Sequence, residues 1–257
     1  GVAATFCPKH LFFFFMACGG PPPHKVLLLA TRSGDTAKAL SLLSNKKKIP
    51  DFAYVDEQGR SVMHHAVRLE NTSVLKAVLD ACTVDDATRD NARNGRTPLM
   101  YAANFGRKEA CSLLLEKVGK EQGEKIVAQQ DVNFCNAVHY AADAGHADTL
   151  EYLLSYVSDS TRGEILASTD GGANTPLHKA SAKGHASVAR VLIDHGASVD
   201  VENCDFMTPA RMASTAKQKD WETVISILEG GPESPSQKEV TKAHSFRGEV
   251  KSRKNRK

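Results

Sequence analysis

Residues 173–185 read Ala-Asn-Thr-Pro-Leu-His-Lys-Ala-Ser-Ala-Lys-Gly-His, and residues 95–106 read Gly-Arg-Thr-Pro-Leu-Met-Tyr-Ala-Ala-Asn-Phe-Gly. Weaker versions of the same pattern occupy residues 59–67, 135–146 and 208–213. A Thr hydroxyl suits a helix N-cap, because it satisfies an orphan backbone N–H. Pro suits the first helical position, where a missing N–H costs nothing. The pattern therefore predicts a short helix that recurs along the chain.

The spacing of the central alanine defines the repeat. This alanine falls at Ala30, Ala66, Ala102, Ala141, Ala180 and Ala213, in steps of 36, 36, 39, 39 and 33 residues. A pair of large aliphatic residues follows 12 and 13 positions later in five of the six units, as in Leu114-Leu115, and predicts a second helix. Because a helix pair this short cannot bury both faces alone, the units are expected to stack.

The glycines fit the same scheme. Gly34, Gly106, Gly145 and Gly184 stand where the first helix should end, a position that favours left-handed backbone. The second unit has Glu70 there and the sixth has Lys217.

The repeats resemble the ankyrin repeat family, most closely in the fifth unit with its Asp-His-Gly-Ala-Ser-Val-Asp segment at 194–200. The resemblance covers residues 24–229, about six units. It implies an all-α solenoid of helix–turn–helix units joined by β-hairpin-like fingers. The first and sixth units look like terminal caps. The third and fourth carry extra residues around 118–123 and 155–162, which we interpret as a longer second helix or an enlarged loop.

The two ends differ from this repeat domain. Residues 1–23 form an N-terminal extension, in which the Gly-Gly-Pro-Pro-Pro-His run at 19–24 is expected to be a linker. The apolar run at 11–17 is either the core of a signal peptide or part of an upstream extension. Residues 230–257 form a basic tail; its last 20 residues carry eight Lys and Arg against two Glu, and we expect disorder there and in the N-terminal extension.

Composition sets further limits. Charged residues make up 25% of the chain and the net charge is +3, which is ordinary for a soluble protein. No stretch approaches the roughly 18 apolar residues of a membrane-spanning helix, so we expect no transmembrane segment. The six cysteines are widely spaced, which favours free thiols in a reducing compartment.

No pattern of catalytic or metal-binding residues stands out, so we expect no enzyme activity and no cofactor, although an unfamiliar active site stays open. The family resemblance gives structural hydrogen-bonding roles to most of the repeat histidines, namely His64, His139, His178, His146 and His185. An alternative is a zinc site at the N-terminus, with Cys7, His10, Cys18 and His24 as its ligands.

The resemblance also implies that a partner protein binds the concave face, through finger tips and first helices. By register, the candidate residues are Arg60, Arg68, Leu69, Arg93, Asn94, Arg96, Asn104, Phe105, Asn133, Asp143 and Lys183. The four arginines should gather with Leu69 and Phe105, and Arg and aromatic residues are common interface hot spots. We therefore expect a partner with an acidic patch and an apolar anchor. The alternative is that these are solvated charges.

The tail ends in a cluster formed by Lys251, Arg253, Lys254, Arg256 and Lys257. It is interpreted as a solubilising tail, a nuclear import signal, or a contact for nucleic acid or anionic lipid. The expected function is thus a protein–protein adaptor, scaffold or regulatory subunit. The alternative is a nuclear or nucleic-acid-associated protein that acts through the tail. The expected location is the cytoplasm, or the nucleus if the tail is an import signal.

Overall fold

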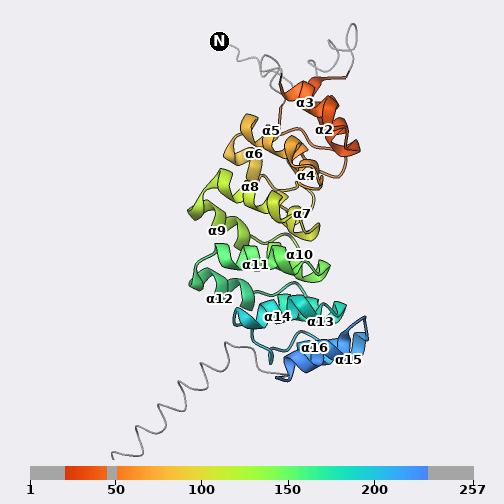
Figure 1. Ribbon diagram of the computed structural model, residues 1–257, viewed down its shortest axis with the longest axis vertical. Coiled ribbons are helices and arrows are strands. Elements are labelled where there is room, and N and C mark those ends of the chain that lie inside the picture. The colour runs from red at the N-terminus through yellow and green to blue at the C-terminus, as the bar shows by residue number, and fades with distance from the viewer. Residues whose placement is uncertain (1–20, 45–50, 231–257) are drawn as a thin grey trace, which may run out of the picture.

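The computed structural model describes residues 21–44 and 51–230 and shows an elongated stack of helix pairs in chain order (Figure 1). The first helices of the six units are α2 (Pro23–Ser33), α4 (Val62–Ala66), α7 (Pro98–Asn104), α10 (Ala137–Ala144), α13 (Pro176–Lys183) and α15 (Pro209–Ala216). The second helices are α3 (Thr36–Leu43), α5 (Ser73–Ala81), α8 (Lys108–Val118), α11 (Ala147–Tyr156), α14 (Ala186–Asp194) and α16 (Trp221–Leu228). The predicted six-unit helical solenoid is confirmed over the described residues.

The helix starts follow the predicted capping chemistry. The Thr97 hydroxyl accepts a hydrogen bond from the Met100 backbone N–H at 3.3 Å, and the Thr175 hydroxyl accepts one from the His178 N–H at 3.4 Å. The proline after each threonine occupies the first turn of its helix. The central alanines are buried in every unit, which lets each first helix pack closely on the next.

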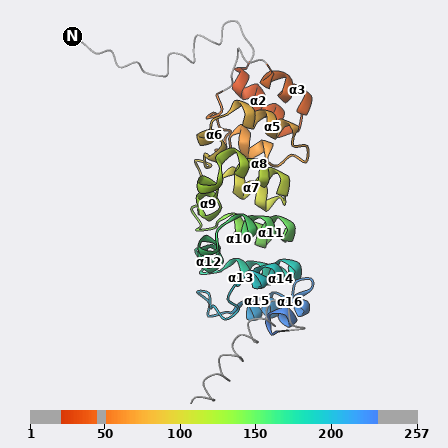
Figure 2. The same cartoon turned by 60° about the vertical axis from the view of Figure 1, so that its left-hand side comes forward.

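The extra residues of the third and fourth units form a third helix in each. These are α9 (Lys120–Ala128) and α12 (Asp159–Ala167), and the second unit has a shorter one, α6 (Val84–Thr88). The expectation of a longer second helix or an enlarged loop was therefore wrong. Gly119 has a φ of 79° and ends α8, so the chain turns and begins again as α9. The third helices line up along one side of the stack, and α9 contacts α12 (Figure 2).

The start of the domain also differs from the prediction. Helix α2 begins at Pro23 and includes His24, two residues that were assigned to the linker. Proline is compatible with helix at this first position because the missing N–H has no intrahelical partner there. The expected disorder, the signal-peptide interpretation, the zinc ligands Cys7, His10 and Cys18, and the basic tail cluster lie outside the described residues.

Candidate functional site

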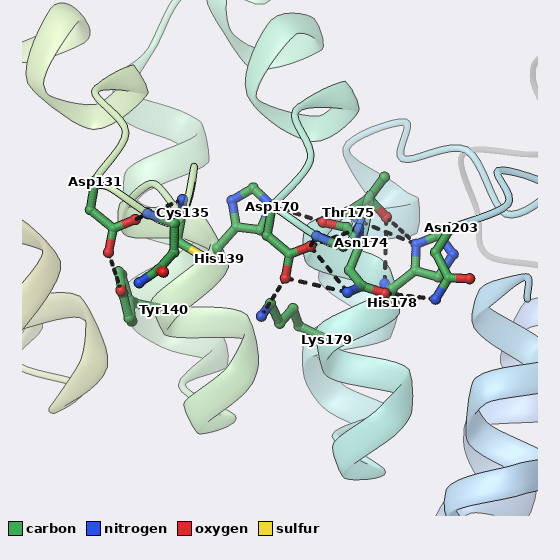
Figure 3. A network of polar contacts seen from close by, with 12 residues as sticks. Asp131, Cys135, His139, Tyr140, Asp170, Asn174, Thr175, His178, Lys179 and Asn203 are labelled. Carbon is green, nitrogen blue, oxygen red and sulfur yellow. Dashed lines mark hydrogen bonds and ion pairs between the residues drawn. The ribbon is translucent and has the colours of Figure 1, made fainter. Parts of the chain in front are cut away.

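Each unit after the first opens with a tight turn, which we call a finger. Fingers 2 to 6 comprise residues 56–60, 91–96, 131–135, 170–174 and 203–207, and in each the first residue donates its N–H to the carbonyl of the last. In finger 5 the Asp170 Oδ1 accepts hydrogen bonds from the Gly172 and Asn174 N–H groups, both at 2.9 Å (Figure 3). The side chains that hold the fingers in this way are Asp56, Asn91, Asp131, Asp170 and Asn203.

The same carboxylates fasten the fingers to the first helices. Asp131 Oδ2 accepts a hydrogen bond from the Tyr140 hydroxyl at 2.6 Å, and Asp170 Oδ2 lies 2.6 Å from Lys179 Nζ (Figure 3). Burial alone would raise the pKa of Asp170, but hydrogen bonds from Lys179 and the backbone outweigh it and lower that pKa. The Asp170 carboxylate is therefore ionised at neutral pH, and its hydrogen bonds stabilise the conformation of finger 5.

Buried histidines join units 2 and 3, units 4 and 5, and units 5 and 6. His64 Nε2 lies 3.0 Å from the Arg96 carbonyl, and His178 Nε2 lies 3.0 Å from the Met207 carbonyl. His139 Nε2 likewise lies 3.3 Å from the Asn174 carbonyl of the next unit. Burial lowers the pKa of His64 and of His139 to about 4, so both rings are neutral at pH 7. The predicted structural roles of these histidines are confirmed.

A second set of histidine contacts lies at the other end of the first helices. His146 Nε2 is 3.1 Å from the Asn104 carbonyl, and His185 Nε2 is 3.1 Å from the Asp143 carbonyl. Both contacts connect neighbouring units, which confirms the structural role predicted for His146 and His185.

Backbone hydrogen bonds join fingers 3 to 6 side by side. Val132 donates its N–H to the Asn94 carbonyl at 3.2 Å, Gly171 to the Asn133 carbonyl at 3.0 Å, and Cys204 to the Gly172 carbonyl at 3.1 Å. The finger tips therefore present one continuous surface across these four units.

Two phenylalanines project from this surface. Phe134 and Phe206 are 58% and 72% exposed and have φ values of 61° and 55°, in the left-handed region. Glycine occupies the equivalent position in fingers 2 and 3, at Gly59 and Gly95. Left-handed backbone costs a residue with a side chain about 1–2 kcal/mol. The two aromatic side chains are thus exposed at positions where glycine would be less strained.

A hollow of about 480 Å³ lies between fingers 4 and 5 and the first helices behind them. Its walls include Phe134, Tyr140, Asp143 and Lys179, and the small residues Gly171 and Gly172 form part of its rim. Asp143 and Asn133 are two predicted partner-binding residues that line this hollow, and Arg96 is a third.

The four predicted arginines divide into two groups. Arg60, Arg93 and Arg96 belong to the fingers, whereas Arg68 follows helix α4, near the far ends of the first helices. Arg68 lies 5.2 Å from the centre of the Phe105 ring, so the predicted Arg–aromatic cluster exists in part. Leu69 packs near Gly34 in the unit before.

Two of these arginines are engaged within the chain. Arg60 Nε donates to Asp56 Oδ2 at 3.0 Å. Burial would raise the pKa of Asp56, but hydrogen bonds from Arg60 and His65 lower it to about 2. Arg96 Nε lies 3.4 Å from Asp131 Oδ2. Among the described residues, Arg68 and Arg93 have no ion-pair partner.

The other predicted residues serve mostly through their backbone or remain on the surface. The Asn94 and Asn133 carbonyls join fingers, and the Asn104 carbonyl accepts the His146 contact. Lys183 is exposed at the end of α13. Sequence reasoning missed Phe134 and Phe206, although aligning the finger glycines with the alanine spacing would have marked both positions.

Over residues 21–44 and 51–230, no group of three or more His, Cys, Asp or Glu side chains could hold a metal ion. In the same ranges no helix is long and apolar enough to cross a membrane. The four cysteines described are free thiols, of which Cys204 is exposed.

A family model described as ankyrin repeats (3 copies) matches residues 27–126, 84–163 and 123–203. Together these matches cover residues 27–203, more than half of the 257-residue chain. Comparison with curated proteins found no match. Ankyrin repeats generally mediate protein–protein interaction and are typically not enzymes. With its capped helix pairs, joined fingers and matched repeats, this chain belongs to the ankyrin repeat family.

Proposed function

We propose that the protein is a non-enzymatic adaptor, scaffold or regulatory subunit that binds a partner on the surface formed by its fingers and first helices. One observation carries the proposal: six large apolar side chains are exposed among the described residues, and four belong to this surface. These four are Phe105, Val132, Phe134 and Phe206. Exposed apolar side chains on a continuous surface favour an interaction site, and aromatic residues are frequent hot spots.

Backbone strain supports the same conclusion. Phe134 and Phe206 hold a left-handed conformation without burying their rings in the core. The stability of the isolated chain does not account for an aromatic residue there, whereas contact with a partner would. Residues in strained conformations concentrate at functional sites.

The charges support an acidic element in the partner. Arg68, stacked beside Phe105, offers a cation next to an apolar ring, and Arg93 is exposed on finger 3. We propose that an acidic patch of the partner meets these two residues, while Arg60 and Arg96 mainly hold the fingers. We also propose the cytoplasm or nucleus as the place of action, from the cysteine spacing and the basic tail.

Affinity capture from native lysate with quantitative mass spectrometry tests the proposal. The baits are the intact chain, a Phe134→Gly/Phe206→Gly variant and an Arg68→Glu/Arg93→Glu variant. A matched control is Val84→Ala, which trims an exposed apolar residue on α6, away from the fingers. We expect a shared set of proteins to be lost with both surface variants and kept with the control. Identical captured sets for all four baits would refute the proposed surface.

A further inference from the structure

An acidic border surrounds Phe206 on the sixth finger. Asp200, Glu202 and Asp205 are exposed, and residues 196–210 contain no Lys or Arg. None of the three carboxylates has an ion-pair partner within the described ranges. Arg211, the next cation along the chain, donates its Nη1 to the Phe206 carbonyl at 3.0 Å. With three unpaired carboxylates against this one cation, this part of the surface keeps an excess of negative charge beside an exposed aromatic ring, and it is complementary to a basic segment with an apolar side chain.

The finger row has a small tip between two exposed phenylalanines. Phe134 and Phe206 stand two units apart, or about 20 Å at the usual 8–10 Å between packed helices. Finger 5 lies between them with Gly171, Gly172 and Ala173 at its tip. The small tip between two aromatic neighbours leaves room for an apolar group, and Gly172 also borders the hollow of about 480 Å³.

The chain leaves the described structure beside this surface. In unit 5, the chain runs from the end of α14 directly to finger 6. Helix α16 takes the equivalent place in unit 6, packs on α14 and α15, and ends at Leu228. By the same geometry, the last described residues, Glu229 and Gly230, lie on the finger side of the stack.

The chain beyond Gly230 has the complementary chemistry. Residues 238–257 contain eight Lys and Arg against two Glu, and Phe246 stands directly before Arg247. Phe246 lies 16 residues past Gly230, a reach of up to about 50 Å in an extended chain. The tail is therefore long enough to bring its aromatic ring to fingers 5 and 6.

We propose that residues 238–257 of this chain dock on its own finger tips, with Phe246 between Phe134 and Phe206 and the basic side chains against Asp200, Glu202 and Asp205. Individual surface charge contacts are weak and are screened by salt. A tethered segment reaches an effective concentration in the millimolar range, so weak contacts suffice. The tail thus covers the site proposed for the partner and competes with it.

Photo-crosslinking in the full chain tests this docking. Phe246 is replaced by p-benzoylphenylalanine, and the products are mapped by mass spectrometry at low micromolar protein. We expect crosslinks within one molecule, to residues 171–173 and 203–207. Neutralising the border with Asp200→Asn, Glu202→Gln and Asp205→Asn should reduce their yield about tenfold, because three weak charge contacts are lost together. Raising the salt to about 0.5 M should act in the same direction.

A control variant neutralises three exposed carboxylates outside the fingers, Asp80→Asn, Glu116→Gln and Glu164→Gln, and should leave the yield unchanged. Far-UV circular dichroism and thermal midpoints confirm that each variant is folded. Crosslinks outside the fingers, crosslinks between two molecules, or equal losses in the two triple variants would overturn the proposal. Since no partner is needed in this experiment, its failure would leave the proposed partner-binding function standing.

Discussion

Acidification from pH 7 to pH 5 should lower the free energy of unfolding by about 4 kcal/mol through two buried histidines. Burial lowers the pKa of His64 and His139 from 6.5 to about 4 in the folded chain. The unfolded chain therefore binds more protons than the folded chain, and stability falls as the pH falls. At pH 5 an unfolded ring is about 97% protonated and a folded ring about 10%, which corresponds to about 2 kcal/mol per histidine.

Other groups act in the same direction or are silent over this range. Burial also lowers the pKa of His178 and His65 in the folded chain, so both add to the loss. The pKa of Asp56 is lowered from 3.8 to about 2, and its contribution to stability is lost only as the pH falls below about 4. The change between pH 7 and pH 5 therefore reports the histidines.

A histidine-to-methionine substitution isolates the pH dependence, because the chain already has methionine at the same position in one unit. Met100 occupies the histidine position of unit 3 and is buried there. A His64→Met/His139→Met variant should lose about 2 kcal/mol of stability at pH 7, about 1 kcal/mol for each of the two Nε2 contacts to the next unit. At the helix start the methionine sulfur can accept the backbone N–H, as Met100 does from Thr97. The double variant should also lose about 4 kcal/mol of pH dependence. The variant should therefore be less stable than the natural chain at pH 7 and more stable at pH 5.

Urea titrations followed by far-UV circular dichroism at both pH values, at constant ionic strength, measure this crossing. Each single variant should show half of the change. If the double variant kept the full pH dependence, or if the natural chain were equally stable at both pH values, the assignment of neutral histidines to the unit boundaries would be refuted.

Three further predictions concern left-handed positions. Gly184→Ala should lower the free energy of unfolding by more than about 2 kcal/mol, because its Cβ would overlap the Lys219 carbonyl. Gly196→Ala has open space around it and should lose only about 1 kcal/mol through backbone strain. Equal losses in urea titrations would contradict this. Lys217→Gly should stabilise the chain by about 1 kcal/mol, because Lys217 ends α15 with a φ of 46°, and an unchanged midpoint would count against it. Phe134→Gly/Phe206→Gly should raise the thermal midpoint while it removes partner binding; a lower midpoint would instead assign the rings to the fold.

The repeat architecture could be predicted from the sequence because its signals are local. A threonine followed by proline fixes the start of α7 and α13, and the buried alanine fixes which face packs. The third helices could not be told from extended second helices, since Ile126 and Leu166 carry apolar patterning that fits both. The deciding feature is the backbone between the helices, which is the positive φ of Gly119 before α9 and the extended conformation of Val157 and Ser158 before α12. A composition-based linker likewise failed at Pro23, where a proline begins a helix.

The candidate site was harder to predict, because the repeat register gives the position of a residue in its unit but not the side chains that it contacts. Arg60 was placed on the interaction surface, but its nearest partner is a carboxylate of its own finger. The sequence did not indicate that Phe134 and Phe206 are exposed, because an isolated phenylalanine usually predicts a buried position in the core. Their exposure follows from the left-handed finger position, which the sequence marks only through the glycines at the same place in fingers 2 and 3.

At the boundary between units 3 and 4, contacts of Arg96 take the place of the histidine hydrogen bond. Methionine at position 100 cannot make the hydrogen bond that histidine makes between units 2 and 3, 4 and 5, and 5 and 6. At this boundary Arg96 instead reaches Asp131 of the next unit and lies 4.6 Å from the centre of the Tyr140 ring. Because the Asp131 side chain is fully buried, reversing the charge of Arg96 would leave a buried carboxylate uncompensated. Loss of binding in that variant would report a damaged boundary between units 3 and 4. Arg93, which is exposed, gives the cleaner test of the surface.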